Sequence, residues 1–411
     1  MQAVVSYRSV PKILDIITHK TSLAINWIPH FTSVINWTLR LGLGLLQEVK
    51  PIQEKWIAII DHSIDIGTKK ALVVLRVTAD KLQKRGSSIT LEDCECIGLT
   101  VSDKITGESI SEELTAIFKQ SGQPCAIIKD KDYTLNKGVV LWKKREKGNS
   151  AIIDDIGHVV ANALKKQFEA TKCYGEFKRL LSQGAARLRQ TDLAFLIPPK
   201  LRSKGRFQSI SHLGKWGEKV LDKFAVKGRA KKNSLLDRFR IAFPDLGTLR
   251  PFIETFAQTA SITSQIMKRL KNKGFSQESY DHCKALTDRL PVRSKVKKEI
   301  KTWLDNHLTV YHKLDIPALL VSSDIIESLF GRFKHVIERS PQADMNRTVL
   351  LIPALCGKMD ETTILRTFSQ TCHAELKEWE VNNIPYTVRK NRQLFFSSGE
   401  SRNGENLLLQ K

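Results

Sequence analysis

The stretch KWIAIIDHSIDIG, residues 55–67, constrains the fold most, because it puts a carboxylate at the end of an unbroken apolar run. Trp, Ile, Ala, Ile and Ile in succession are typical of a strand buried on both faces. A buried carboxylate without a partner costs several kcal/mol. The sequence therefore predicts a central strand whose Asp61 meets a positive group, and a metal ion is one such group.

The chain carries a large excess of positive charge. Its 411 residues include 66 Lys and Arg against 43 Asp and Glu, a formal net charge of +23. A field of this sign attracts polyanions, so nucleic acid is the first partner we expect. A membrane is the rival partner, but no segment approaches the ~18 uninterrupted apolar residues of a spanning helix, and the N-terminal sequence lacks the pattern of a signal peptide. We therefore expect no membrane anchor.

Seven cysteines indicate a reducing compartment, because they are odd in number, scattered, and without a CxxC pair or a matching His spacing. They are Cys94, Cys96, Cys125, Cys173, Cys283, Cys356 and Cys372. We therefore predict free thiols, no zinc knuckle and a cytoplasmic location.

Residues 1–52 are predicted to be a helical segment with a break near residues 27–30. The second run reads TSVINWTLRLGLGLL, in which Thr32 is a candidate N-cap. Two short helices around such a break are typical of a helix-turn-helix, whose second helix lies in a DNA major groove. The alternative is a helical hairpin that packs on the next domain.

From residue 53 the pattern changes from helical to strand-like. Three strand candidates, WIAIIDHSIDIG, KKALVVLRVTA and SITLEDCECIGLTV, are joined by short links, as in an antiparallel meander. Next come the helical stretch SISEELTAIFKQSG, the apolar run PCAIIKD, a helix or loop, the run SAIID and the helix IGHVVANALKKQF. This order is that of an RNase H-like mixed α/β sheet, whose first part we place at residues 53–160.

A basic and mainly helical insertion follows at residues 161–318. The residues that we expect to contact DNA there are Arg202, Lys204, Arg206, Lys231 and Lys232. The predicted core resumes at 319–380, and 381–411 is expected to be a C-terminal tail. The predicted fold is thus an RNase H-like sheet with a large α-helical insertion and an N-terminal helical segment.

Isolated aromatic residues have two interpretations each. Trp142 in VVLWKKREKG and Trp216 in HLGKWGEKV lie next to cations and suit a stacking platform for an unpaired base. Burial in the core is the more common environment of tryptophan, and we favour it. His62 and His212 have no partner in their own sequence neighbourhood, so we interpret them as structural.

Two carboxylates are placed by this fold at the ends of neighbouring strands. Asp61 belongs to the first strand and Asp130 follows the fourth, with Asp132 as a close competitor. Asp154 and Asp155 compete as well, but the strand before Asp130 leads into the basic crossover KKREKG, which favours Asp130. The first and fourth strands of this fold are neighbours, so the two carboxylates would repel each other unless they shared a cation. Oxygen ligands of this kind select Mg²⁺ or Mn²⁺.

A third acid is expected on a helix that packs across the sheet. Glu327 in SSDIIESLFGRFKHV is the candidate, and Lys334 lies two turns later on the same side of that helix, where it can hold a phosphate. Glu327 also has a structural interpretation, since Asp324 and Glu327 have the spacing of a capping box. The set of three acids, Asp61, Asp130 and Glu327, is what favours catalysis.

This set resembles the acids of DDE transposases of the RNase H-like class. Asp61, Asp130 and, after a long helical insertion, Glu327 follow their order. The segment DIGH, which ends at His158, resembles the C/DxxH motif of hAT-type transposases, although His158 also suits a local role at a helix start. Glu327 with Lys334 resembles the Glu-x6-Lys part of a cut-and-paste bacterial signature. QTDLAFLIPPKLRSKGRF is similar to segments of bacterial insertion-sequence transposases.

The resemblance implies an enzyme that cuts double-stranded DNA at element ends and joins these ends to a target. Two Mg²⁺ or Mn²⁺ ions would be held by Asp61, Asp130 and Glu327, with His158 and Lys334 at the DNA. It further implies a homodimer that holds two ends, located in a bacterial cytoplasm at the nucleoid. Two alternatives stay open: a transposon-derived DNA-binding protein without catalysis, and an RNase H-like nuclease without strand transfer.

Overall fold

The computed structural model describes residues 5–22, 25–52, 55–66, 69–85, 88–200, 210–225, 230–314, 316–337, 345–384 and 387–398. The chain divides into two units. Unit 1 comprises Met1–Arg85, Ile89–Ile153 and Ser323–Lys411, and unit 2 comprises Gly86–Ser88 and Asp154–Ser322. No helix within the described ranges is both long enough and apolar enough to span a bilayer.

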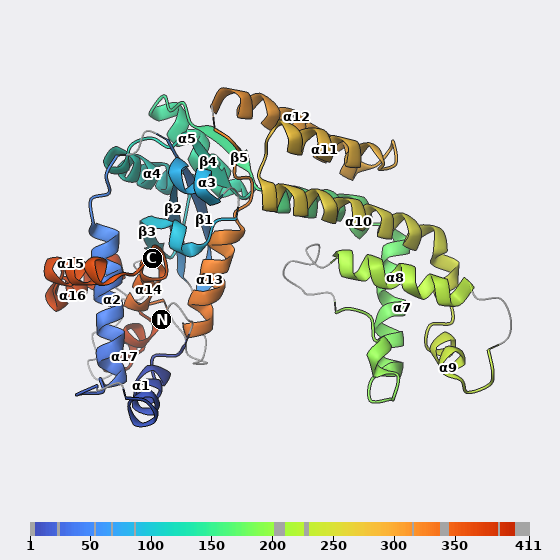
Figure 1. Cartoon of the computed structure of the whole chain (residues 1–411), viewed down its shortest axis with the longest axis horizontal. Helices are drawn as coiled ribbons and strands as arrows, with labels where there is room; N and C mark the ends of the chain where they lie inside the picture. Colours follow the sequence, from blue (N-terminus) through green and yellow to red (C-terminus); the bar gives the residue numbers. More distant parts are fainter. Residues whose placement is uncertain are drawn as a thin grey trace. The chain divides into compact units, whose positions relative to one another are not determined.

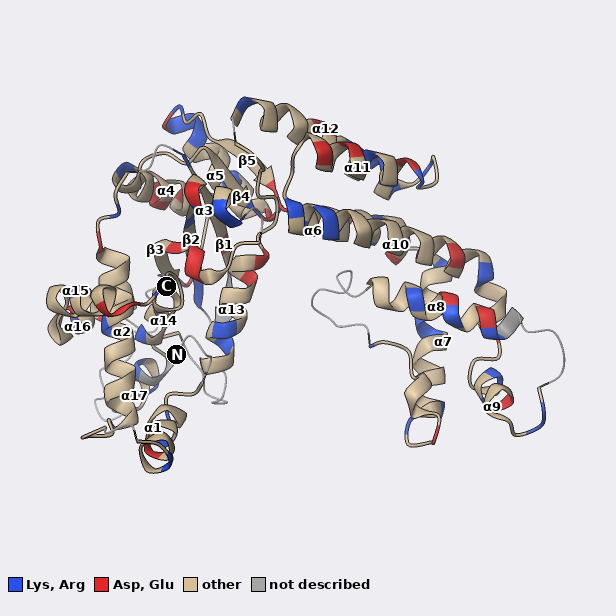
Figure 2. Cartoon of the chain, in the orientation of Figure 1, with Lys and Arg blue, Asp and Glu red and all other residues tan. Residues whose placement is uncertain are grey.

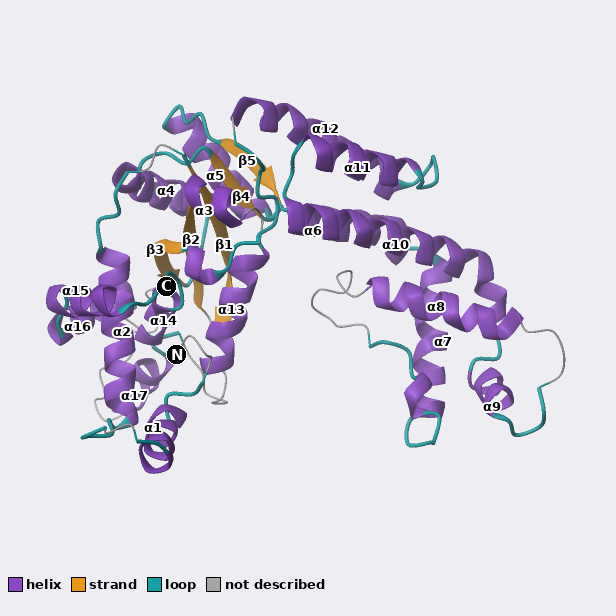
Figure 3. Ribbon diagram, viewed as in Figure 1, coloured by secondary structure: helices purple, strands orange, loops and turns teal. Residues whose placement is uncertain are grey.

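A five-stranded sheet organises unit 1, and its strands are orange in Figure 3. The strands are β1 (Trp56–Ile66), β2 (Lys69–Thr78), β3 (Glu95–Ser102), β4 (Ala126–Lys129) and β5 (Ala151–Asp154). Their order across the sheet is β3-β2-β1-β4-β5; β2 is antiparallel to β1 and β3, whereas β4 is parallel to β1. The first and fourth strands are therefore neighbours, and the predicted mixed sheet of the RNase H-like kind is confirmed.

One face of the sheet packs under α4 (Gly107–Ser121) and α5 (Tyr133–Arg145). Side chains alternate between faces along a strand, and the even-numbered residues of β1 from Trp56 to Ile60 point into this core. The segment before β5, for which the sequence allows a helix or a loop, is helix α5. Trp142 is 1% exposed in the same core, so the interpretation of this tryptophan as a core residue is correct.

The opposite face of the sheet carries α13 (Asp324–Ile337), which packs against β1, as Figure 1 shows. The buried side chains of α13 are apolar and recur at helical spacing: Ile326, Leu329, Phe330, Phe333 and Val336. The core under α4 and α5 is built from other side chains. Helix α13 therefore covers the face to which the odd-numbered residues of β1, from Ile57 to Asp61, point.

Helix α2 (Phe31–Gln47) is a packing element of unit 1 that also contacts β3. The C-terminal helices that it contacts are α14 (Leu351–Ala354), α15 (Glu361–Gln370) and α16 (His373–Asn383). A Cβ atom at Gly42 would lie 1.8 Å from the carbonyl oxygen of Leu350, so this approach requires glycine. Helix α2 therefore packs on the rest of unit 1. Binding of DNA by α2 and α1 (Ser9–Lys20) stays a prediction.

The N-terminus of α2 differs from the predicted one. Thr32 lies inside the helix, and the N-cap is His30. Nδ1 of His30 accepts from the backbone N–H of Thr32 at 3.5 Å and lies 2.9 Å from the Thr32 hydroxyl. The helix is therefore capped by an imidazole nitrogen and not by the hydroxyl oxygen of Thr32 that the sequence predicts.

The segment 381–411, predicted to be a tail, is helical in part. Helix α16 ends at Asn383, and α17 (Val388–Ser398) follows it. The α17 sequence, VRKNRQLFFSS, has no Gly or Pro to interrupt a helix. Residues 381–383 and 388–398 of the segment predicted to be a tail are therefore helical, and residues 399–411 lie outside the described part of the chain.

Unit 2 is mainly helical and has its own core. Its helices are α6 (Ile156–Leu164), α7 (Lys172–Leu188), α8 (Ile210–Ala225), α9 (Leu235–Ala242), α10 (Arg250–Lys273), α11 (Gln277–Asp288) and α12 (Lys295–Leu314). Helix α10 packs against α6, α8 and α11. Half-buried Trp216 packs edge-to-face on Phe243, with ring centroids 5.5 Å apart. The N–H of Ile156 donates to the carbonyl oxygen of Val321 at 3.1 Å, so the two ends of this unit are adjacent.

The seven cysteines are free, and they differ in burial. Burial raises the pKa of the Cys94, Cys96 and Cys283 thiols to about 12. Cys173 and Cys372 are exposed. In a titration with an aromatic disulfide reagent at pH 8, we expect Cys173 and Cys372 to react first and the buried thiols at least ~10²-fold more slowly, because the thiolate is the reacting species. Equal rates for all thiols would contradict this packing.

Candidate active site

Asp61 lies on the face of the sheet that α13 covers. It pairs with Val73 of β2, and the register shifts only beyond it, between Asp61 and Ile64. Because side chains alternate along a strand, Asp61 shares its face with Ile57 and Ile59, both 0% exposed. The buried strand therefore carries its half-buried carboxylate to the edge of the apolar core.

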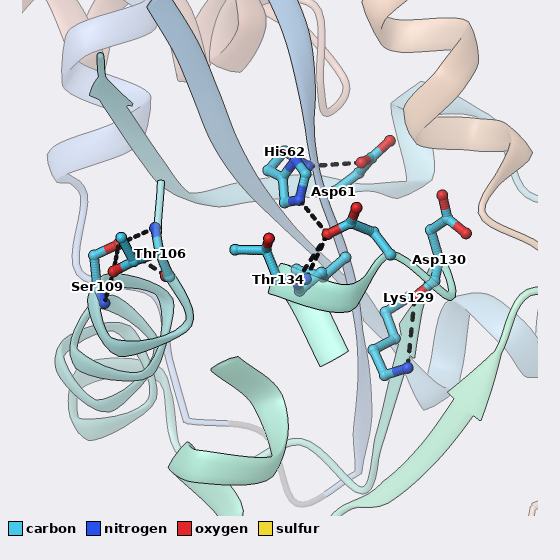
Figure 4. A network of polar contacts seen from close by, with 9 residues as sticks. Asp61, His62, Thr106, Ser109, Lys129, Asp130 and Thr134 are labelled. Atoms are coloured by element: carbon cyan, nitrogen blue, oxygen red, sulfur yellow. Dashed lines mark hydrogen bonds and ion pairs between the residues drawn. The ribbon is translucent and has the colours of Figure 1, made fainter. Parts of the chain in front are cut away.

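Asp130 is placed beside Asp61 by the parallel pairing of β1 with β4. The register pairs Ile59 with Ile128, and Asp61 and Asp130 each follow two positions later. Alternation puts Asp130 on the face of Ile128, which is also the face of Asp61. Figure 4 shows the two carboxylates pointing to the same side. The structure thus brings these two predicted site residues together.

Asp132, the alternative to Asp130 as the second acid, has a structural role. It is the N-cap of α5, and its Oδ1 accepts from the backbone N–H groups of Thr134 at 2.8 Å and Leu135 at 3.1 Å. The same oxygen lies 2.9 Å from Nε2 of His62. Partial burial raises the pKa of the Asp132 carboxyl, but the hydrogen bonds from His62 and the two amides outweigh it, so the pKa is lowered. These contacts support Asp130 as the second acid.

Glu327 lies in the first turn of α13 and Lys334 in its last turn, and both are half-buried. Because α13 packs against β1, the helix that carries them lies on the sheet face of Asp61 and Asp130. The third predicted acid is therefore on a helix that packs against the sheet, as expected.

The three carboxylates do not form a single ligand group in this structure. Among the described residues, no set of three or more His, Cys, Asp or Glu side chains is arranged so that it could hold a metal ion. Asp61 and Asp130 supply adjacent hard oxygen donors, whose chemistry fits Mg²⁺ or Mn²⁺. The approach of Glu327 to this pair stays a prediction.

Asp155 and His158 of the DIGH segment form a helix-capping pair in unit 2. Asp155 is 1% exposed and is the N-cap of α6, and its Oδ1 accepts from the backbone N–H of His158 at 3.0 Å. The DxxH spacing therefore has a local structural function, which is one of the two interpretations of His158. Contact between its half-buried side chain and DNA stays a prediction.

The structure describes only some of the basic residues that are expected to contact DNA. Arg202, Lys204 and Arg206 lie outside the described residues, whereas Lys231 and Lys232 are exposed between α8 and α9. Figure 2 shows further Lys and Arg, in blue, along α8. Positive charge is thus accessible to solvent on this unit.

His62 is the polar residue of this region whose partner the sequence does not reveal. Its contact to Asp132 spans 70 positions of the chain. The His62 side chain is 12% exposed, and among the described residues its buried Nδ1 has no hydrogen-bond partner. The sequence has a histidine directly after the first acid and an aspartate two residues after the second, but only the strand pairing brings the two side chains together.

Comparisons with known proteins give a distant structural likeness. No protein-family model matches the chain, and no curated protein matches it either. Among solved structures, the fold is similar to that in the Drosophila P element transposase strand transfer complex, with a TM-score of 0.43, 10% sequence identity, and coverage of 82% of this chain and 87% of that chain. What this chain does is therefore inferred from its own residues.

Proposed function

We propose that the chain is a DNA transposase that cuts and joins DNA with two divalent metal ions held by Asp61, Asp130 and Glu327. The observation that carries this proposal is the equivalent placement of Asp61 and Asp130 on neighbouring parallel strands, on the sheet face against which α13 packs. Two carboxylates on one face repel each other, and a shared cation relieves that repulsion. The resemblance of the acid order to DDE transposases supports the same role.

Each residue of this site has a defined task in the proposal. Bound divalent ions activate the attacking oxygen and stabilise the leaving oxygen of a phosphodiester. Asp61, Asp130 and Glu327 would hold these ions. Lys334, on the helix of Glu327, binds a DNA phosphate. In cleavage, water would attack the phosphorus and the P–O3′ bond would break, which frees a 3′-hydroxyl. In joining, this 3′-hydroxyl would attack a target phosphodiester and displace its 3′-oxygen, so no side chain forms a covalent bond to DNA.

Double-stranded DNA is the proposed partner because of the net charge of +23 and the exposed cations of the insertion, including Lys231 and Lys232. Binding to a duplex replaces condensed counterions on the phosphates by Lys and Arg side chains. We further propose a homodimer, since joining requires two element ends to be held together.

We expect the affinity for duplex DNA to fall steeply with salt. If the chain neutralises about 6 to 10 phosphates, the association constant decreases by roughly 10³ to 10⁵ between 50 and 200 mM salt. Fluorescence anisotropy with a labelled duplex measures this slope. A nearly flat dependence on salt would contradict a phosphate-binding role for the insertion.

The direct test is an assay on a supercoiled plasmid that carries the DNA flanking this reading frame. With Mg²⁺ we expect cleavage at the element ends and joined products, and with EDTA instead of Mg²⁺ we expect neither. Cleavage without joined product would show a nuclease. Tight binding without any cleavage would show a DNA-binding protein that lacks catalysis.

A further inference from the structure

His62 and Asp132 connect the two chain segments that carry the acids. His62 directly follows Asp61 on β1, and Asp132 lies two residues beyond Asp130. Nε2 of His62 is 2.9 Å from Oδ1 of Asp132, as Figure 4 shows. An ionised carboxylate only accepts hydrogen bonds, so Nε2 of the ring is the donor. One side-chain contact therefore ties the end of the first strand to the segment after the fourth.

The two consecutive residues of β1 act on opposite faces of the sheet. Alternation directs Asp61 to the face of α13 and His62 to the face of α5. The backbone N–H of His62 donates to Oδ1 of Asp61 at 2.6 Å. The same residue therefore supplies both the ring that contacts Asp132 and the amide that orients the Asp61 carboxylate.

The other end of this connection is held by a helix. Asp132 accepts from the N–H groups of Thr134 and Leu135 at the N-terminus of α5, whose buried side chains belong to the sheet core. The positive end of the helix dipole favours a carboxylate at this position. Asp132 is thus a fixed anchor, and the 12% exposure of the His62 side chain leaves the ring little room to move.

We propose that His62 and Asp132 form a positioning clamp that sets the separation and orientation of the Asp61 and Asp130 carboxylates for a divalent cation. This inference rests on the proposed function, since it concerns the same metal site. Neither clamp residue touches the ion: His62 acts through Asp61, and Asp132 acts through the segment that carries Asp130. Outer-shell partners of this kind contribute about 10- to 100-fold to metal affinity.

Mn²⁺ binding to the full chain, followed by electron paramagnetic resonance of free Mn²⁺, tests the clamp without a catalytic assay. We expect His62→Ala to weaken Mn²⁺ binding by roughly 10- to 100-fold. His62→Gln is the rescue variant, because the amide nitrogen of Gln can occupy the position of Nε2 and donate to Asp132. We expect its affinity to return to within about threefold of the unmodified chain.

A matched pair of variants separates the clamp from helix stability. Asp132→Ala removes the N-cap of α5 together with the clamp. Thr106→Ala removes only the N-cap of α4, where the Thr106 hydroxyl accepts from the N–H of Ser109 at 3.1 Å (Figure 4). Each lost cap is expected to lower the free energy of unfolding to a similar extent. Only Asp132→Ala is expected to weaken Mn²⁺ binding.

The outcomes distinguish the clamp from the site itself. If Asp61→Asn weakens Mn²⁺ binding but His62→Ala and Asp132→Ala do not, the clamp is refuted and the metal site stands. If Asp61→Asn leaves Mn²⁺ binding unchanged, both the site and the clamp are refuted. Equal losses in Asp132→Ala and Thr106→Ala would show a stability effect and overturn the clamp.

Discussion

We expect Asp61→Asn to abolish the proposed Mg²⁺-dependent DNA cleavage and to leave duplex binding intact. The amide keeps the shape of the side chain but has no charge, so the proposed shared cation would lose the ligand that strand β1 provides. Loss of a group that stabilises the transition state costs on the order of 10² to 10³ in rate, and more where two ions depend on it. Plasmid cleavage and fluorescence anisotropy measure the two properties on the same preparation.

The control for this substitution is Asp360→Asn. Asp360 is also in unit 1 and is the N-cap of α15, where it accepts from the N–H of Thr363 at 2.9 Å. Asn caps a helix as well as Asp does, so both folding and cleavage are expected to be unchanged. Full cleavage by Asp61→Asn would refute the site, and loss of DNA binding in this variant would show that the substitution disturbs more than the metal ligand.

Gly42→Ala strongly destabilises unit 1. The added Cβ would lie 1.8 Å from the backbone oxygen of Leu350, which cannot swing aside as a side chain can. Helix α2 must therefore shift away from the segment before α14. We expect the free energy of unfolding to fall by about 1–3 kcal/mol or more, as for overpacked cores. Urea unfolding followed by tryptophan fluorescence measures this change.

Gly331→Ala is the matched substitution with the opposite sign. Gly331 is an exposed residue within α13, and a Cβ there has no atom within 4 Å. Alanine is the better helix former by about 0.5–1 kcal/mol, so this variant is expected to gain stability. If Gly42→Ala were as stable as Gly331→Ala, the close packing of α2 on Leu350 would be contradicted.

The sequence was sufficient for the sheet because its strands are distinct apolar runs of different length. The run that ends at Asp61 and the shorter one before Asp130 have the order of an RNase H-like core, and the parallel pairing of β1 with β4 follows that order. Strand alternation then places both carboxylates on one face. Local patterns and one topological rule thus suffice for this pair of acids.

The other features of the site and fold depend on contacts between distant residues, which local sequence patterns do not predict. His62 has no partner within its own sequence neighbourhood, and only the register of β1 beside β4 brings it to Asp132. The N-cap of α2 was missed because His30 is an uncommon capping residue, whereas Thr32 has the preferred type. The distance of Glu327 from Asp61 and Asp130 depends on the position and rotation of α13 on the sheet. The spacing of its apolar residues does not determine either one.

The hydrogen bond between Ile156 and Val321 has an evolutionary consequence. Because Ile156 and Val321 are hydrogen-bonded, the segment Asp154–Ser322 begins and ends at adjacent points and forms a module of its own. Such a module can be lengthened, shortened or exchanged without altering how β1 pairs with β4. Under the proposed function, descendants of this chain can therefore acquire new DNA preferences in the module while they inherit the acids of the sheet unchanged.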